Sequence, residues 1–198
     1  MITVDDYVLR PLRYDDEKFM YETMKDFPAA TMSLKAVRDA MSLMLHVGEV
    51  FDESNVVNEC SICMVLEYQG TPVSFRFNKF EGNVCDVVLA ATHPDHRGQG
   101  HFSAQAMMFG IWYFEHLGID ECFLELVDTS DVNATAAKWR SVTNRTEETR
   151  KARLSDQMLS KLVIRPEDFR SRLKSHPTYS TSNFMVGDIQ FPTTPRTD

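Results

Sequence analysis

Residues 87–103 combine a strand-like apolar run, a turn with two closely spaced glycines and the start of a helix-like run. Gly98 and Gly100 let the backbone turn tightly with no Cβ in the way, so the amides from Gly98 to Ser103 can point to one place. The dipole of the following helix and its unpaired first-turn amides also favour negative charge. The stretch therefore predicts an anion site that fits a pyrophosphate, to which the Arg97 guanidinium adds charge.

The two common phosphate-binding motifs do not fit this stretch. The dinucleotide fingerprint G-x-G-x-x-G requires a third glycine where Ser103 stands, and the P-loop requires a lysine directly after Gly100. Pro94 donates no hydrogen bond and disfavours helical angles at His93, so the strand should end near these residues. The glycines therefore indicate either another kind of anion site or an ordinary strand–turn–helix link in which they serve tight packing.

The stretch resembles the acyl-CoA-binding motif of the GNAT N-acyltransferase superfamily, Arg/Gln-x-x-Gly-x-Gly/Ala after a strand that ends near Val-x-Pro. Here Thr92, His93 and Pro94 take the place of the strand end. Arg97 and Gly100 occupy the first two specified positions of the motif, and Phe102 stands where the family usually has glycine or alanine. The resemblance implies a site for acetyl-CoA, which Phe102 narrows or alters near the phosphates.

The resemblance also implies how the cofactor is held. The acyl-pantetheine arm enters the gap between the two parallel strands, the fourth and fifth expected ones, like an added strand. It binds backbone groups of the fourth strand. The pyrophosphate lies on the glycine turn, and an asparagine after the second strand reaches the cofactor. The implied cofactor-binding residues are Ala90, Ala91, Thr92, Arg97, Gly98, Gln99, Gly100, His101, Phe102, Ser103 and Asn133.

The implied reaction moves an acetyl group to a primary amine by direct attack in a ternary complex, with no covalent intermediate. It needs a donor to the developing oxyanion and a base for the ammonium proton. Asp86 and Glu125, on the fourth and fifth expected strands, are the candidate catalytic bases. For Asp86 the alternatives are a side chain on the wrong face of the sheet and a solvated strand-end position. The tyrosine that often protonates the leaving thiolate in this family is replaced by Arg140.

The spacing of apolar residues predicts an α/β chain of the α+β type. Helical patterns cover residues 16–24, 33–48, 98–117 and 134–140, and strand-like runs cover 7–12, 60–68, 73–80, 84–92, 122–127, 146–152 and 158–164. A helix connects the fourth run to the fifth, so these two strands should be parallel. We expect a single GNAT-like domain with a mixed central sheet of about six to seven strands, flanked by about four helices and splayed at the fourth and fifth strands.

The composition is that of a globular chain: 198 residues, 43% of them hydrophobic, suit one domain with a substantial core. No run approaches the roughly 18 apolar residues of a membrane span, and the first residues do not resemble a signal peptide, so we expect a cytoplasmic protein.

Residues 1–137 carry 9 basic and 22 acidic side chains, whereas residues 138–174 carry 11 basic and 5 acidic ones. The acidic body disfavours nucleic acid and favours a cationic acceptor, either a small-molecule amine or a protein amine.

Four cysteines lie in apolar, strand-like runs, where free cysteine behaves as a small buried hydrophobe. The spacing of Cys60 and Cys63 is that of a redox or zinc pair, but the sequence has no second such pair. Strand geometry also places these two side chains on opposite faces. Cys60, Cys63, Cys85 and Cys122 are therefore expected to be reduced core thiols, and no metal site is predicted.

We expect residues 1–169 to form the acyltransferase domain and residues 170–198 a C-terminal extension or interaction tail. The end of this extension is rich in Ser, Thr and Pro yet carries an apolar cluster, which can add an edge strand or dock on a second copy in a homodimer or larger assembly. A disordered terminus is the alternative. Together with Phe102 and Arg140, this tail supports a contrasting hypothesis, a catalytically silent GNAT-like binding or assembly module.

Overall fold

The computed structural model describes residues 1–25, 32–48, 51, 59–127, 146–151, 158–174 and 185–187, of which 125–127, 146–151, 158–160 and 186 are described by their backbone. The helices in these ranges are α1 (Glu17–Met24), α2 (Leu34–Gly48), α3 (His101–Ile111) and α5 (Pro166–Leu173). Short 3₁₀ turns cover η1 (Tyr14–Asp16) and η3 (Pro94–His96), and a π-helical turn, η4 (Trp112–His116), continues α3. The expected helix at residues 134–140 lies outside the described residues.

The strands form one mixed sheet in the order β7-β8-β6-β5-β4-β3-β2-β1-β9. Their bounds are β1 (Ile2–Val4), β2 (Tyr7–Pro11), β3 (Cys60–Tyr68), β4 (Thr71–Glu81), β5 (Val84–Thr92), β6 (Glu121–Val127), β7 (Thr146–Lys151), β8 (Met158–Ile164) and β9 (Met185–Val186). The β5–β6 pair is parallel, and its neighbours are antiparallel. The sheet contains all the expected strands and two further short ones, β1 and β9, at one edge. The predicted fold class, a mixed sheet flanked by helices, is confirmed.

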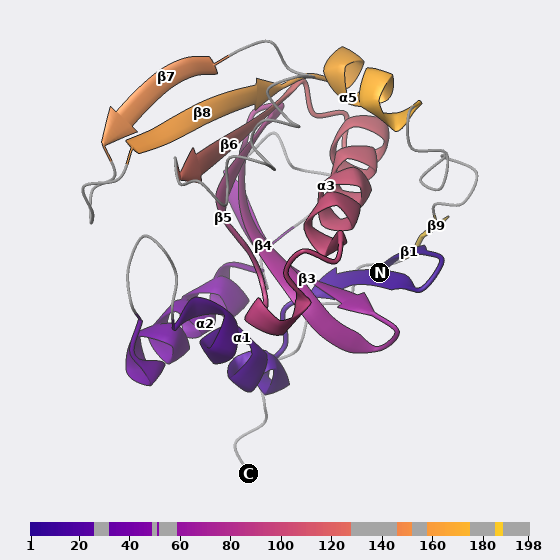
Figure 1. The fold of residues 1–198 in the computed structure, drawn as a ribbon. Coiled ribbons are helices and arrows are strands. Elements are labelled where there is room, and N and C mark those ends of the chain that lie inside the picture. Colours follow the sequence, from indigo (N-terminus) through magenta and orange to yellow (C-terminus); the bar gives the residue numbers. More distant parts are fainter. Residues whose placement is uncertain are drawn as a thin grey trace.

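Helices cover both faces of the sheet (Figure 1). Helices α3 and α5 pack on one face in a core that includes Phe109, Trp112 and Phe169. Helices α1 and α2 pack on the other face in a second core that includes Met20 and Val37. Nine of the eleven residues of α3 are buried, as expected for a helix that is apolar on most sides. No helix in the described part of the chain is long and apolar enough to cross a membrane.

The cysteines and the tail agree with the patterns that the sequence suggested. Cys60 packs against the core under α3, whereas Cys63 belongs to the core under α1 and α2, so the two side chains lie on opposite faces. All four cysteines are free, and burial raises the pKa of Cys63 and of Cys85. Strand β9 pairs with β1 of the same chain, where the Gly187 amide donates to the Met1 carbonyl at 2.8 Å. The division of the chain at residue 169 and the docking of the tail on a second copy stay predictions.

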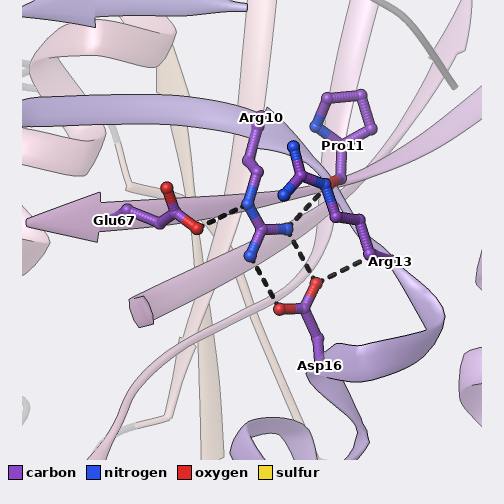
Figure 2. A network of polar contacts seen from close by, with 5 residues as sticks. All are labelled: Arg10, Pro11, Arg13, Asp16 and Glu67. Atoms are coloured by element: carbon purple, nitrogen blue, oxygen red, sulfur yellow. Dashed lines mark hydrogen bonds and ion pairs between the residues drawn. The ribbon is translucent and has the colours of Figure 1, made fainter. Parts of the chain in front are cut away.

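A buried ion pair fixes the start of α1 against the sheet (Figure 2). Arg10 of β2 donates two hydrogen bonds to the Asp16 carboxylate, at 2.7 and 2.8 Å, and one to Glu67 of β3 at 2.6 Å. The Asp16 carboxylate also accepts from the Arg13 amide at 2.8 Å, and both Arg10 and Asp16 are 4% exposed. These acceptors stabilise the charged guanidinium and raise the pKa of Arg10 despite the opposing effect of burial. The network therefore holds β2, β3 and α1 together.

The first turn of α3 is anchored through an aromatic cluster. Tyr7 of β2 lies with its hydroxyl 3.1 Å from His101 Nδ1, and the Tyr68 ring centre lies 5.2 Å from that of His101. Burial, followed by the nearby charge of His96, lowers the pKa of His101 below its ordinary value of 6.5. Burial is also the main cause that lowers the pKa of His93. The neutral form of His101 is therefore the form that this packing favours.

Replacing Asp16 with alanine should destabilise the protein by about 3–5 kcal/mol, because it leaves the buried Arg10 charge without its main partner. Urea unfolding at neutral pH measures this loss. In the matched control Asp39→Ala, which breaks an exposed pair with Lys35, the change should stay within about 0.5 kcal/mol. An equally small effect for Asp16→Ala would show that the buried pair does not hold α1.

The free energy of unfolding should fall as the pH drops from about 7 to about 5, because unfolded His101 and His93 take up protons at an ordinary pKa that their folded forms resist. The stabilising difference is present above the unfolded pKa of 6.5 and is lost as the pH falls from there through the lower folded pKa values. Urea titrations across this range should give a smaller loss for His101→Gln than for the wild type. An identical pH slope in the two proteins would contradict the assignment.

Candidate active site

The parallel strands β5 and β6 part in the middle of the sheet. They pair over four residues, from Val84 opposite Glu121 to Val87 opposite Leu124, and their described pairing ends there. Beyond this point β5 continues to Thr92 along β4, and β6 continues along β8. In the part of the chain that the structure describes, each strand therefore has one edge without a strand partner beyond this point. The splay that the sequence predicted at these two strands is present.

A bulge in β5 lies where the splay begins. In the β4–β5 register, Phe77 is opposite Leu89 and Asn78 is opposite Val87, which leaves Val88 as the extra residue. Val88 is 54% exposed. A bulge bends its strand and changes the direction of the following backbone groups. The stretch containing Ala90 and Ala91, two of the expected cofactor-binding residues, lies on this redirected segment.

The glycine turn joins the end of β5 to α3. Gly98 and Gly100 have φ angles of +76° and +90°, and a Cβ added at either would meet no atom within 4 Å. Arg97 Nε donates to the Thr92 carbonyl at 3.2 Å, and Gln99 Nε2 donates to the Asp95 carbonyl at 3.0 Å, so two side chains brace the turn from within. The turn is therefore held in a left-handed conformation with open space around both glycines.

The first-turn amides of α3 are available at the same place. Gly100 is the N-cap residue and has no side chain to accept from them, and the first helical bond runs from the Ala104 amide to the Gly100 carbonyl. The amides of His101, Phe102 and Ser103 come before this bond in the chain, so they have no hydrogen-bond partner within the helix. The His101 side chain itself is 4% exposed and turns into the protein, so its backbone is what faces the turn.

The candidate bases lie near the point where the strands part, and the structure describes them unequally. Asp86 is exposed and lies between Cys85 and Val87, which pack under α3, so its side chain lies on the opposite face of the sheet. Glu125 is the first β6 residue beyond the parallel pairing and is opposite Lys161 of β8, but its side chain is outside the described part. Asn133 and Arg140 also lie outside the described residues.

The sequence analysis missed a row of buried polar side chains between β4 and α3. Gln105 Nε2 donates to Ser74 Oγ at 2.9 Å, and the Tyr113 hydroxyl donates to Asn78 Oδ1. Between these pairs, the Arg76 guanidinium lies 4.7 Å from the centre of the Phe109 ring. The alternation of Ser74, Arg76 and Asn78 along an otherwise apolar strand is the pattern in the sequence that could have indicated this row.

The similarity of this chain to known proteins lies in its structure and not in its sequence. No protein-family profile matches the chain, and no curated protein sequence matches it either. A solved structure of spermidine N-acetyltransferase from Vibrio cholerae, in complex with CoA and spermine, has a TM-score of 0.62 at 13% identity, with 84% of this chain and 99% of that chain covered. A variant of the same enzyme gives 0.63 at 13% identity, covering 85% and 99%.

The ribosomal-protein-S18-alanine N-acetyltransferase from Escherichia coli gives a TM-score of 0.59 at 14% identity, covering 80% of this chain and 93% of that chain. The alignments cover 80–85% of this chain and 93–99% of these three neighbours, so the similarity concerns most of the sheet with its helices. At this level of identity it shows the fold and leaves the residues of the site to be argued from the chain itself. The splayed parallel strands, the glycine turn and these neighbours together identify the fold as that of the GNAT N-acyltransferase superfamily.

Proposed function

We propose that this protein is an acetyl-CoA-dependent N-acetyltransferase that acts on a primary amine. The observation that carries the proposal is the open glycine turn directly at the end of β5, the strand whose other edge is unpaired beyond Val87. An elongated ligand with a phosphate group at one end fits these two features together. A lone helix start would bind an anion but would give no place for the rest of such a ligand.

The cofactor would bind along β5 and onto the turn. Backbone groups of Ala90, Ala91 and Thr92 would pair with the amides of the pantetheine arm, as in strand addition. The pyrophosphate would accept hydrogen bonds from the first-turn amides of α3, and Arg97 would add charge at the turn. In this proposal Gly98, Gln99, Gly100, His101, Phe102 and Ser103 form the phosphate site, and Asn133 reaches the cofactor from the segment after β6.

The reaction would be a direct transfer. The neutral amine attacks the thioester carbonyl carbon, a C–N bond forms, the C–S bond breaks, and the CoA thiolate leaves and takes up a proton. Asp86 or Glu125 would accept the proton that the amine loses, directly or through water. Asp86 suits an acceptor that approaches on the face of α1 and α2, because its side chain lies on that side of the sheet.

The charge of the chain supports a cationic acceptor. The net charge is −8, and a field of this sign attracts polyamines, aminoglycosides and lysine side chains. The spermidine N-acetyltransferase among the structural neighbours is in complex with CoA and spermine, which supports the same class of acceptor. A small-molecule amine or a protein amine is therefore the proposed partner.

A catalytically silent module is the second candidate. The exposed glycine turn is followed by the bulky Phe102 instead of the small residue of the motif, and β9 shows that part of the tail adds to the sheet. Such a module would bind a partner or assemble with further copies through the tail. A protein that binds CoA but acetylates no amine in a broad panel would fit this candidate and contradict the enzyme.

The wild-type protein should bind both acetyl-CoA and desulfo-CoA in calorimetry, and Gly100→Glu should weaken both at least tenfold, or about 1.4 kcal/mol. The variant places a carboxylate and a strained left-handed residue where the pyrophosphate should lie. Gly82→Glu is the matched control, because Gly82 also has a positive φ and open surroundings but lies at the other end of β5. Equal affinities for wild type and Gly100→Glu would remove the turn from the cofactor site.

One of the variants Asp86→Asn and Glu125→Gln should lower kcat/KM for the amine about 100-fold at neutral pH, because a positioned general base contributes at least that much. Acetyl-CoA affinity should stay at the wild-type value, since neither residue is proposed to contact the cofactor phosphates. Initial rates and calorimetry on the same preparations separate the two effects, with the exposed Asp120→Asn as control. Wild-type rates in both variants would rule out both carboxylates as the base.

A further inference from the structure

Arg76 is a buried cation without an ionic partner in the described structure. The residue is 4% exposed, and its Nε and Nη2 atoms have no hydrogen-bond partner there. None of the described carboxylates lies within ion-pair distance of it. Its guanidinium lies 4.7 Å from the centre of the Phe109 ring, and its charge also favours a lower pKa for Cys85 and Tyr113, against the larger effect of burial. Burying a guanidinium costs free energy that its partners must offset. A cation–π contact offsets only part of that cost.

The polar neighbours of Arg76 hydrogen-bond to one another, except that the buried Gln105 Oε1 has no partner. The Asn78 amide donates to the Arg76 carbonyl and its oxygen accepts from Tyr113, while Gln105 donates to Ser74. These groups are neutral, so they add no negative charge to the site. An anion that hydrogen-bonds to the unsatisfied N–H groups of Arg76 would therefore stabilise this charge, and the described part of the chain does not supply one.

A cavity of about 20 Å³ connects Arg76 with the point where β5 and β6 part. Its lining includes Arg76, Val87, Leu124 and Gly110, and Val87 and Leu124 are the last residues that pair in parallel. The volume suffices for about one water molecule before a ligand enters. The end of the splay therefore lies beside the cavity that the Arg76 guanidinium lines.

We propose that the site accepts, besides acetyl-CoA, an acyl donor with a carboxylate at the far end of its acyl group, as in a short dicarboxylic acyl thioester, and that this carboxylate pairs with Arg76. The inference rests on the proposed function, because it places the thioester at the end of the splay. A planar guanidinium with two free N–H groups matches a carboxylate in shape and charge. The small cavity favours a malonyl or succinyl group over a longer chain.

The acyl group is the source of this carboxylate because the cavity lies on the α3 face. That face is closed by α3, η4 and α5, whose residues Ala106, Phe114 and Phe169 also line the cavity. The amine would approach on the opposite face, where Asp86 is exposed. During transfer the amine forms the C–N bond, the C–S bond breaks and the CoA thiolate takes up a proton, while the distal carboxylate is unchanged. Arg76 would thus select the donor without taking part in the chemistry.

Malonyl-CoA and isovaleryl-CoA provide a matched test, because their acyl groups have the same heavy-atom skeleton and differ in the charged end. Calorimetry on the wild-type protein should give malonyl-CoA at least a tenfold advantage, as expected for a buried charge-assisted pair. Arg76→Met should reduce this advantage to about twofold or less, because only the charged pair is lost. Its affinity for acetyl-CoA should stay at the wild-type value, and Arg170→Met, which removes a surface arginine, should keep the preference.

Arg76→Met should fold with a Tm no lower than that of the wild type, because an apolar side chain replaces an unpaired buried charge and can still pack on Phe109. Arg76→Lys is the second variant, which keeps a charge but loses the planar fork and should retain part of the malonyl preference. If Arg76→Met is poorly folded, Arg76→Lys with an unchanged malonyl preference would overturn the role of the guanidinium geometry.

The outcomes separate this inference from the proposed function. Binding of desulfo-CoA with equal affinities for malonyl-CoA and isovaleryl-CoA would overturn the inference and leave the cofactor site intact. Failure of every CoA compound to bind would overturn both. Stabilisation of the wild type by free malonate, lost in Arg76→Met and without any preference among the thioesters, would assign the anion to a source other than the acyl group and overturn the inference.

Discussion

The end of backbone pairing between β5 and β6 is the constraint on which the site depends. Strand edges inside a sheet carry N–H and C=O groups that need partners, and beyond Val87 and Leu124 the other strand no longer supplies them. The bulge at Val88 and the helical crossover through α3 keep the two strands apart at this end. In the described structure these edges have no strand partner, and the proposed cofactor site rests on this feature.

The burial of α3 ties this slot to the glycine turn. Because nine of its eleven residues are buried, the helix has a fixed position against β4, and its first residue is further held by Tyr7. The amides that precede the first helical bond are therefore held at one end of β5. The start of α1 is fixed separately, through the Arg10–Asp16 pair, on the face where an acceptor would approach.

The sequence predicted the elements well because they depend on local patterns. The strands at residues 60–68 and 84–92 and the helix that ends at Gly48 have bounds that apolar periodicity and turn residues already indicate. Contacts between distant residues could not be predicted in this way. The helical pattern that begins at residue 16 does not indicate that the Asp16 carboxylate binds Arg10 and the Arg13 amide, nor that no side-chain cap bond forms at the start of α1. The burial of Arg76 without a described carboxylate partner could not be predicted for the same reason.

The two buried arginines show why such contacts carry functional information. Arg10 and Arg76 are equally buried, at 4% exposure, and both lie in strands of the same sheet. Arg10 has two carboxylates and a backbone carbonyl as acceptors, so its charge is neutralised within the protein and its role is structural. Arg76 faces a cavity with two unsatisfied donors in the described structure. Since burial disfavours an uncompensated charge, the difference between the two sites is best explained by a ligand that completes the second one.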